Sequence, residues 1–326
     1  MRAVIVKQPG GPEQLSIGTW TTPQPGPDEV LVLVSATAVN RADTLQRQGK
    51  YPVPDGESPI LGLEMAGEVV EVGPAVTRWQ VGDRVCGLLG GGGYAQYAVI
   101  NQDMALPIPD GMGYAEAAAI PEVFMTAFQS LIWLGELQAA ERVLIHAGGS
   151  GVGTAAIQIA REKGAEVIVT ASTPKHDLCR ELGASLTIDY KKEDFKEAVM
   201  AYTQGQGVDV VLDFVAGPYF QSNLELLQTD GRLIMLALLG GGNLSEANLT
   251  PILRRRLQII GSTLRNRSQS YKAQLTQALH AFAWARFQKG HLRPIIDRVM
   301  PWQEVAAAHR IMEANQNAGK IVLEID

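Results

Sequence analysis

The sequence contains few cysteines and no long apolar segment. Only two of its 326 residues are cysteine, Cys86 and Cys179, and they lie far apart. Two cysteines cannot build a disulfide framework or a cysteine-based metal site, and their scarcity indicates a reducing cytoplasm. No apolar run approaches the ~20 residues that a bilayer-spanning helix needs, so we expect no membrane partner. The opening stretch MRAVIVKQPG alternates and then turns, which is typical of a first β-strand and not of a signal peptide.

Positive charge is also scarce. Lys and Arg number 28 against 34 Asp and Glu, which gives a formal net charge of −6. An acidic protein has no general attraction for nucleic acid or for anionic membranes, so we expect neither as a partner. The one dense basic cluster, Arg254–Arg256, is interpreted as a solvated helix end. The content of 46% hydrophobic and 19% charged residues is that of a globular protein, and the length favours two domains of ~150 residues each.

The chain changes its pattern twice. Residues 1–121 are rich in Gly, Pro and short alternating runs such as EVLVLVSATAVN, which predicts a β-rich, barrel-like unit. Over residues 122–264, short apolar strands alternate with helical segments, which predicts a parallel, doubly wound α/β sheet. A long helix is expected over 271–290, and the tail after it alternates again and ends in a strand. Residues 1–121 and 265–326 are therefore predicted to form one domain, into which the α/β domain is inserted.

A glycine-rich turn joins the first strand and the first helix of the α/β domain. RVLIHA, residues 142–147, is the predicted strand, and the helix is expected to begin near Thr154. Glycine lets an anion approach backbone N–H groups, and a helix N-terminus adds its positive dipole end. The spacing departs from G-x-G-x-x-G, but the position between strand and helix favours a dinucleotide diphosphate over the alternative of a merely tight turn. The candidate contacts in this turn are Gly148, Ser150, Gly151, Val152 and Gly153.

The end of the next strand bears on the choice of cofactor. An NAD site carries an acid there, about 20 residues on, to bind the ribose hydroxyls. In VIVTASTPK the corresponding residues are Thr170 and Ser172, with Lys175 just beyond. Two hydroxyls and an ammonium can donate to a 2′-phosphate that an acid would repel, so the pattern favours NADPH. Lys175 could instead be a solvated residue at the start of a helix, and this alternative stays open. For Tyr190, which closes the third strand, a position along the adenosine and simple packing both stay open.

Several motifs together resemble one family. The stretches RVLIHAGGSGVGTAAIQIAR, AVNRADTLQRQGKYP, ILGLEMAGEVVEVG, GDRV and NAGKIVLE resemble the medium-chain dehydrogenase/reductase superfamily. Within it they resemble the zinc-independent quinone oxidoreductase (zeta-crystallin-like) branch, and GSTLRNRSQSYK is similar to its tumour-suppressor-inducible NADPH type. The resemblance implies a Rossmann NADP-binding domain inserted into a GroES-like catalytic domain, with the active site in the cleft between them. It also implies a homodimer through an edge strand, here LQIIGSTL.

The zinc ligands of related dehydrogenases have no match in this sequence. Zinc-dependent relatives begin their catalytic site with Cys-x-x-Asp, where this chain has NRAD at 40–43. Leu63 stands in place of their histidine ligand, and the sequence has no four-cysteine lobe. Amides and carboxylates alone are poor zinc ligands, so we expect no metal. Asp43 is expected either to orient its neighbours or to pair with Arg41 or Arg47.

The resemblance also implies roles for individual residues. Asn40 and Thr126 are expected near the nicotinamide, with Asn40 hydrogen-bonded to the ring region or to the substrate oxygen. Tyr51, in GKYPVP, is expected to donate a hydrogen bond to the quinone oxygen, with an exposed loop tyrosine as the alternative. His146 is interpreted as a packed histidine and not as a base. The other implied cofactor contacts are Ala216, Leu239, Gly240, Leu264, Arg265 and Asn317.

The combined expectation is an NADPH:quinone oxidoreductase that needs no zinc. A quinone is already electrophilic, so a well-positioned nicotinamide in a water-poor cleft is sufficient. The branch implies small ortho- and para-quinones and one-electron transfer to a semiquinone, while the residues themselves do not distinguish one-electron from two-electron transfer. Two alternatives stay open. One is an NADPH-dependent enoyl or enone reductase, in which Tyr51 supplies the proton; the other is a low-turnover NADPH-binding protein, crystallin-like or RNA-binding.

Overall fold

The computed structural model describes residues 1–244 and 246–326, and the chain divides into two compact units. Unit 1 comprises Met1–Met125 and Leu264–Asp326, and unit 2 comprises Thr126–Thr263. The sequence pattern placed these boundaries at 121/122 and 264/265. The first boundary lies inside helix α3 (Pro121–Phe128), so the change of pattern marks the start of that helix and not the boundary itself.

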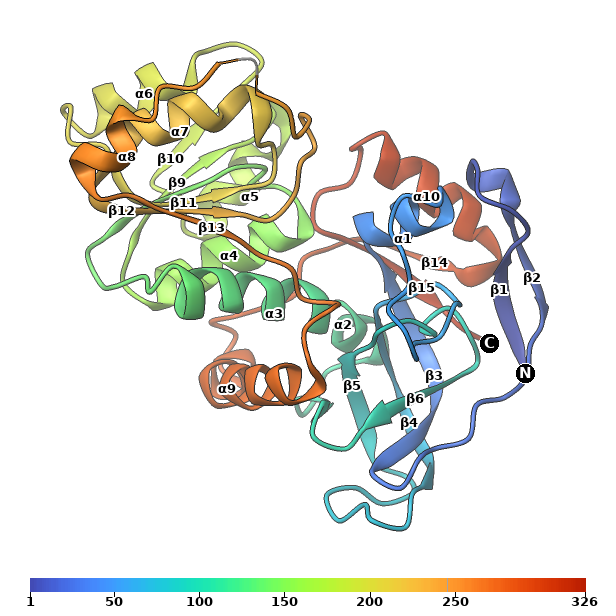
Figure 1. Cartoon of the computed structure of the whole chain (residues 1–326). Helices are drawn as coiled ribbons and strands as arrows, with labels where there is room; N and C mark the ends of the chain where they lie inside the picture. The colour runs from blue at the N-terminus through green and yellow to red at the C-terminus, as the bar shows by residue number, and fades with distance from the viewer. Residues whose placement is uncertain (245) are drawn as a thin grey trace. The chain divides into compact units, whose positions relative to one another are not determined.

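Unit 2 is built on a parallel six-stranded sheet in the order β10-β9-β8-β11-β12-β13 (Figure 1). Its strands are rich in buried Val, Ile and Leu, which is typical of a parallel sheet covered on both faces. The chain enters at β8 in the middle, builds β9 and β10 to one side and then β11 to β13 on the other. Ligands of such sheets bind beyond the carboxyl ends of the strands where this reversal occurs. The strands are β8 (Arg142–Ile145), β9 (Glu166–Thr170), β10 (Leu186–Ile188), β11 (Val208–Asp213), β12 (Leu227–Met235) and β13 (Gln258–Gly261).

The helices of unit 2 follow the strands, as the alternating pattern predicted. Ser150 caps the N-terminus of the first, and Asp194 caps α6 by accepting from the N–H groups of Lys196 and Glu197. The predicted doubly wound α/β sheet is confirmed. The helices are α4 (Gly151–Glu162), α5 (His176–Leu182), α6 (Phe195–Tyr202), α7 (Phe220–Leu226) and α8 (Thr250–Arg255), preceded by a π-helical turn (Gln129–Leu134).

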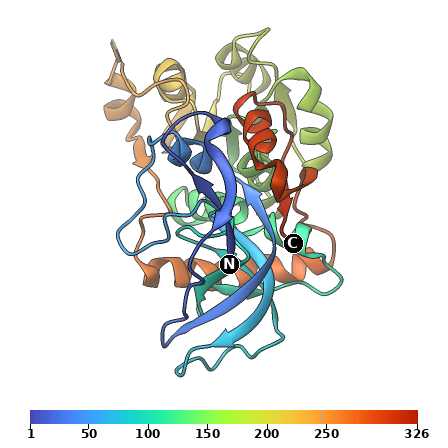
Figure 2. The same cartoon turned by 90° about the vertical axis from the view of Figure 1, so that its right-hand side faces the viewer.

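Unit 1 contains a seven-stranded sheet in the order β14-β15-β3-β4-β5-β7, with β6 paired to β3, and a separate β1-β2 hairpin. The last strand, β15, pairs antiparallel with β3, so the end of the chain joins the sheet formed by its beginning. Both chain ends lie close together in the two views (Figures 1 and 2), and the Arg2 guanidinium donates to the Asp326 carbonyl at 2.7 Å. The strands are β1 (Arg2–Val6), β2 (Leu15–Thr19), β3 (Glu29–Val39), β4 (Glu64–Val72), β5 (Arg84–Leu88), β6 (Tyr97–Asn101), β7 (Ala105–Pro107), β14 (Ile296–Pro301) and β15 (Lys320–Glu324).

Four further helices belong to unit 1. The predicted long helix is α9 (Gln269–Gln288), which begins at an N-cap where Ser268 accepts from the Tyr271 N–H. The tail contains a helix, α10 (Val305–Glu313), that its alternating pattern did not predict; α10 packs against the core through Val305, Ala308 and Met312. The other two are α1 (Arg41–Arg47) and α2 (Tyr114–Ala118). Within residues 1–244 and 246–326, none of the helices combines the length and the apolar character needed to cross a membrane.

Candidate functional site

The glycine turn of unit 2 is shaped by the cap of helix α4. The helix begins at Gly151, earlier than the expected start near Thr154, because Ser150 acts as its N-cap. The Ser150 hydroxyl oxygen accepts from the Gly153 N–H at 3.0 Å, and the Ser150 carbonyl accepts from the Thr154 N–H at 2.8 Å. The first turn of the helix therefore consists of Gly151, Val152 and Gly153, and its dipole is directed at whatever lies before the turn.

Only part of the turn has N–H groups left for a ligand. The Gly148 N–H donates to the Thr170 carbonyl at 2.9 Å, and that of Gly153 is taken by Ser150. The N–H groups of Gly149, Gly151 and Val152 form no hydrogen bond with the part of the chain that the structure describes. Three free donors at the start of a 12-residue helix fit a diphosphate. The N–H groups open to an anion are thus fewer than the predicted run from 148 to 153 suggests.

Two of the glycines are required by packing inside the protein. A Cβ on Gly153 would lie 2.4 Å from the Ala147 carbonyl oxygen, and one on Gly148 would lie 2.8 Å from the Val169 side chain. A Cβ on Gly149 would instead meet the Lys175 side chain, at 2.4 Å from its Cδ. The aliphatic part of Lys175 therefore lies directly over Gly149. This contact places Lys175, which is predicted to bind a 2′-phosphate, beside the glycine turn that is predicted to bind the diphosphate.

Thr170 does not face outward, and its predicted role in cofactor binding stays a prediction that its burial does not favour. Its side chain is 1% exposed, and its hydroxyl is 3.0 Å from Nδ1 of His146. The other ring nitrogen of His146 lies 2.9 Å from Oδ1 of Asn223, and burial lowers the pKa of this histidine. The interpretation of His146 as a packed histidine is confirmed. Ser172 remains half-buried at the start of the 3-10 turn that contains Lys175.

The remaining predicted residues of unit 2 differ in how available they are. Tyr190 follows the end of β10 and is 45% exposed. The Ala216 N–H donates to the Asp213 carboxylate, and its carbonyl accepts from Tyr219 and Phe220, so Ala216 has no free N–H for a ligand. Leu239 and Gly240 are exposed, although their N–H groups are bonded to the carbonyls of residues 214 and 215.

Thr126 carries a hydroxyl that the described residues do not satisfy. Its oxygen is buried, and it has no hydrogen-bond partner among residues 1–244 and 246–326. The Thr126 carbonyl, in contrast, accepts from the Ser130 hydroxyl at 2.7 Å. A buried hydroxyl without a partner is uncommon in native proteins, so this group is available to a bound molecule.

A buried polar cluster lies at the joined ends of β3, β4 and β15 in unit 1. The Lys320 ammonium donates to Oε1 of Glu64 at 2.7 Å, to Oδ1 of Asn40 at 2.6 Å and to the Val39 carbonyl at 3.1 Å. The Glu64 side chain is 0% exposed and that of Lys320 is 3% exposed. The second carboxylate oxygen of Glu64 accepts from the Glu122 N–H at 2.9 Å. The ion pair is therefore fully enclosed and hydrogen-bonded on both sides.

Asn40 is held by this cluster. Its amide nitrogen donates to Glu64 at 2.8 Å and to the Ala38 carbonyl at 3.2 Å, which uses both hydrogens. Its oxygen accepts from Lys320, which leaves a single lone pair for a ligand. Asn40 cannot donate to a substrate oxygen without breaking one of these bonds. Sequence reasoning missed Lys320 and Glu64 as its partners, although a Lys or Glu inside an apolar strand needs an opposite charge when buried.

Asp43 orients its neighbours. It accepts from the Asn40 N–H at 2.8 Å and from the Gly62 N–H at 3.0 Å, and the Tyr94 hydroxyl lies 3.3 Å away. Burial raises the pKa of Asp43 to about 6. Arg41 donates to the Met312 carbonyl and to Asn315, and Arg47 pairs with Glu313. The orienting role is confirmed, and the alternative of an ion pair with Arg41 or Arg47 is wrong.

The predicted residues Tyr51 and Arg265 meet within unit 1. The guanidinium carbon of Arg265 is 5.4 Å from the centre of the Tyr51 ring. Arg265 is 6% exposed, and its Nε donates to the Gly90 carbonyl at 2.8 Å. Burial raises the pKa of the half-buried Tyr51, so its hydroxyl remains a donor at neutral pH. The alternative of an exposed loop tyrosine is therefore wrong. Leu264 is buried, and the Asn317 amide donates to the Gly319 carbonyl at 2.7 Å.

Comparison with known proteins adds to this geometry. Sequence models match over residues 26–110 (alcohol dehydrogenase GroES-like domain) and 151–281 (zinc-binding dehydrogenase). A solved NAD-dependent alcohol dehydrogenase is 32% identical with a TM-score of 0.88, and each chain is covered in full. The CurK enoyl reductase is 30% identical with a TM-score of 0.88, covering 100% of this chain and 99% of that one. The quinone oxidoreductase from Coxiella burnetii is 28% identical with a TM-score of 0.85, covering 100% and 99%.

This chain belongs to the medium-chain dehydrogenase/reductase superfamily. It is therefore an oxidoreductase of that type, built from a GroES-like unit and a Rossmann unit, and this superfamily binds a nicotinamide cofactor. A mycocerosic acid synthase-like polyketide synthase of Mycobacterium tuberculosis is 35% identical over 321 residues, which cover 98% of this chain. The chain spans only 15% of the length of that relative.

Although one matching sequence model is named for zinc, the residues of this superfamily member do not fit a catalytic zinc ion. The described part of the chain contains no group of three or more His, Cys, Asp or Glu side chains arranged to hold a metal. Glu64, which follows Leu63 at the position of a histidine ligand in zinc-dependent relatives, is already bonded to the Lys320 ammonium. A zinc ion beside Glu64 would be repelled by that ammonium and would lack soft or imidazole ligands.

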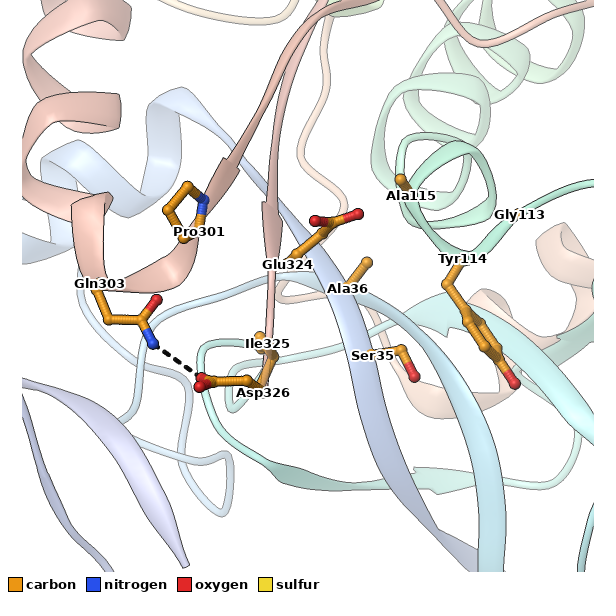
Figure 3. Close-up of a pocket in the computed structure, with 10 residues that line it drawn as sticks. All are labelled: Ser35, Ala36, Gly113, Tyr114, Ala115, Pro301, Gln303, Glu324, Ile325 and Asp326. Atoms are coloured by element: carbon orange, nitrogen blue, oxygen red, sulfur yellow. Dashed lines mark hydrogen bonds between the residues drawn. The ribbon is translucent and has the colours of Figure 1, made fainter.

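A hollow elsewhere in unit 1 does not contain the predicted residues. It has a volume of about 650 Å³ and lies where the ends of β14 and β15 meet the start of α2 (Figure 3). Its polar lining includes the carboxylates of Glu324 and Asp326, and Gln303 donates to Asp326 at 2.9 Å. Carboxylates would repel a diphosphate or an anionic product. This hollow is therefore not our candidate for the cofactor or the acceptor.

Proposed function

We propose that the chain is an NADPH-dependent reductase of small ortho- and para-quinones that works without zinc. The observation that supports NADPH is the contact of Lys175 with Gly149, which sets an ammonium-bearing side chain beside the free N–H groups of the turn. What supports a quinone is the similarity to the quinone oxidoreductase from Coxiella burnetii, and a quinone is compatible with described residues that contain no zinc ligand set. An acceptor that is already electrophilic needs no Lewis acid, and quinones meet that condition.

The residues of the chain bind and orient the reactants. The N–H groups of Gly149, Gly151 and Val152 hold the diphosphate, and Lys175 holds the 2′-phosphate. When bound, NADPH supplies a hydride. Tyr51 donates a hydrogen bond to the acceptor oxygen. The Thr126 hydroxyl, which has no partner among the described residues, would be available to the nicotinamide end of the cofactor.

Oxidation of NADPH by two panels of acceptors tests this function. One panel contains ortho- and para-quinones, and the other contains enones and enoyl thioesters. We expect kcat/KM for the best quinone to exceed that for the best enone by at least about tenfold, which corresponds to about 1.4 kcal/mol. Tyr51→Phe should lower kcat/KM for the best quinone. Turnover confined to the enone panel would contradict the proposal, and an organic radical detected by EPR would indicate one-electron steps. No turnover in either panel would favour the low-turnover alternative.

An enoyl or enone reductase is the second candidate, and two observations favour it. The chain is similar to the CurK enoyl reductase over its whole length. Burial and the neighbouring charge of Glu64 raise the pKa of Glu122 to about 8, so this residue is a carboxylic acid at neutral pH. Enone reduction needs such an acid to protonate the α-carbon, whereas quinone reduction does not.

Glu122→Gln distinguishes the two candidates. The charges that shift the pKa of Glu122 are those of Glu64, Lys320, Asp43 and Arg265. The charge of Glu122 in turn raises the pKa of Tyr51. An enone reductase should lose activity as the pH rises through about 8, and the variant should lose most of its activity at every pH. A quinone reductase should keep its rate in the variant and show no such decline.

We also propose a cytoplasmic homodimer. Strand β13 lies at one edge of the sheet of unit 2, and Ile259 on it is 38% exposed. An open apolar edge favours pairing with a second copy. Both cysteines are buried free thiols, which is consistent with a reducing compartment. Light scattering should give a dimer for the native chain and a monomer for Ile259→Lys; a native monomer would contradict the assembly.

A further inference from the structure

Arg265 is a buried cation whose terminal donors have no partner in the part of the chain that the structure describes. It lies in the turn Leu264–Arg267, where the Arg267 N–H donates to the Leu264 carbonyl at 3.1 Å. Its Nε is bonded to Gly90, but Nη1 and Nη2 are buried without a partner among residues 1–244 and 246–326. Buried guanidinium donors are almost always paired, because leaving them unpaired costs desolvation energy. The two N–H groups are therefore suited to a hydrogen-bond acceptor on a bound molecule that is not part of the described chain.

The nearby carboxylates are committed elsewhere. Glu57 forms its ion pair with the buried Lys272, with 3.4 Å between Nζ and Oε1. Asp43 accepts from two backbone N–H groups, and the raised pKa of Glu122 makes it neutral near pH 7. No described residue forms a direct ion pair with Arg265, so its positive charge is not locally neutralised.

Tyr51 adds a second donor at the same place. Its ring lies beside the Arg265 guanidinium, and its hydroxyl forms no hydrogen bond within the described part of the chain. The guanidinium offers two N–H groups in a fixed plane, and the phenol offers one O–H. Such a set matches a single oxygen that carries negative charge.

We propose that Arg265 and Tyr51 form an oxyanion-binding site for the acceptor. This inference rests on the proposed reductase function. Hydride transfer to the acceptor would break a C–H bond of the reduced nicotinamide, leaving NADP⁺, and would form a new bond to hydrogen on the acceptor, while the displaced π pair moves to a carbonyl oxygen. That oxygen then carries the negative charge of an enolate or phenolate until it takes a proton from water. A fixed guanidinium stabilises this charge more than it stabilises the neutral acceptor, so the pair accelerates reduction and selects conjugated carbonyl compounds.

A nitrophenol is a probe of this site that needs no turnover. Its phenolate absorbs visible light, so bound phenolate and bound phenol are distinguishable in the absence of NADPH. We expect the native protein to bind p-nitrophenolate at least about tenfold more tightly than R265M does, since about 1.4 kcal/mol is a modest share of a charge-assisted pair. The matched control is R267M, two positions along the same turn, which should bind like the native protein. R265K, which keeps the charge but loses the planar fork, should lie between them.

Kinetics give the second readout. R265M should lower kcat by about 10²–10³-fold, as expected for loss of an oxyanion donor, with the Kd for NADPH changed less than about threefold. Added methylguanidinium should restore part of the rate of R265A. Equal binding of nitrophenolate by the native protein and R265M overturns the proposal. It is also overturned if the Kd for NADPH rises as much as kcat/KM falls, because Arg265 is then a cofactor contact. Nitrophenolate binding that depends on Arg265 in a protein without reductase activity would keep the anion site and remove the proposed function.

Discussion

Lys320→Met tests the internal charge of unit 1. Lys320 is buried and donates to three acceptors, of which only Glu64 is charged. Methionine has nearly the same length and fills the same space, so the change removes the charge and the hydrogen bonds with little loss of packing. Glu64 then keeps two donors, the Asn40 amide and the Glu122 N–H, but no counter-charge.

The expected loss is large. Removing one partner of a buried ion pair costs about 3–5 kcal/mol, because the other charge stays buried without compensation. For a domain of about 150–250 residues, each kcal/mol shifts the melting temperature by about 2–4 °C, so the midpoint should fall by on the order of 10 °C. Glu64→Gln in the same chain should recover much of this loss, because a neutral amide no longer needs a cation.

Urea and thermal unfolding of the native chain, K320M, E64Q and K320M/E64Q measure this coupling. The control is R256M, which breaks the solvent-exposed Arg256–Asp230 pair and should leave the midpoint unchanged. If K320M is as stable as R256M, the buried ion pair does not contribute to stability as expected. If the effects of the two single variants simply add in the double variant, the pair is not coupled.

The remaining predictions concern the turn, its neighbours and pH. Gly153→Ala puts a Cβ 2.4 Å from the Ala147 carbonyl oxygen, so the variant should melt at a lower temperature and bind NADPH at least about tenfold more weakly in titrations. The control Gly261→Ala, which has open space around its Cβ, should show neither effect. Thr170→Val should leave the Kd for NADPH within about twofold, because its hydroxyl is internal; a tenfold rise would restore its cofactor role. Burial lowers the pKa of His309 to about 3, so its contribution to stability is complete above pH 6.5 and is lost as the pH falls toward 3. His309→Gln should therefore reduce the loss of stability between pH 6.5 and 4.5 by about 2–3 kcal/mol in denaturant titrations, and an unchanged slope would contradict the assignment.

Local signals in the sequence were sufficient for the architecture of unit 2. Short runs of β-branched residues, such as those of β8 and β9, alternate with helical segments and predict a parallel sheet without any long-range information. The start of α4 was also present in the sequence, because Ser150 is a standard N-cap residue. It was overlooked because three of the residues from 148 to 151 are glycine, which has low helix propensity. Helix α10 was missed in a tail that also contains strands.

The directions and partners of side chains could not be predicted in the same way. Thr170 ends a strand, and whether its hydroxyl faces the ligand side or the His146 side depends on the register and on its neighbours. The Glu64–Lys320 pair joins positions 256 residues apart, because β15 returns to the edge of β3 while β4 lies on the other side of β3. No local pattern reveals such a pair. The same holds for Arg265, whose terminal donors are found without a partner among residues 1–244 and 246–326 only once its surroundings are known.

We propose that NADPH binds with its 2′-phosphate on Lys175 and its diphosphate on the N–H groups of Gly149, Gly151 and Val152, which have no partner among the described residues. Fluorescence titration of NADPH and NADH against the native protein and Lys175→Ala tests this proposal most directly. We expect the native protein to bind NADPH at least about tenfold more tightly than NADH, and the variant to bind the two equally. Equal affinities in the native protein would contradict the claim.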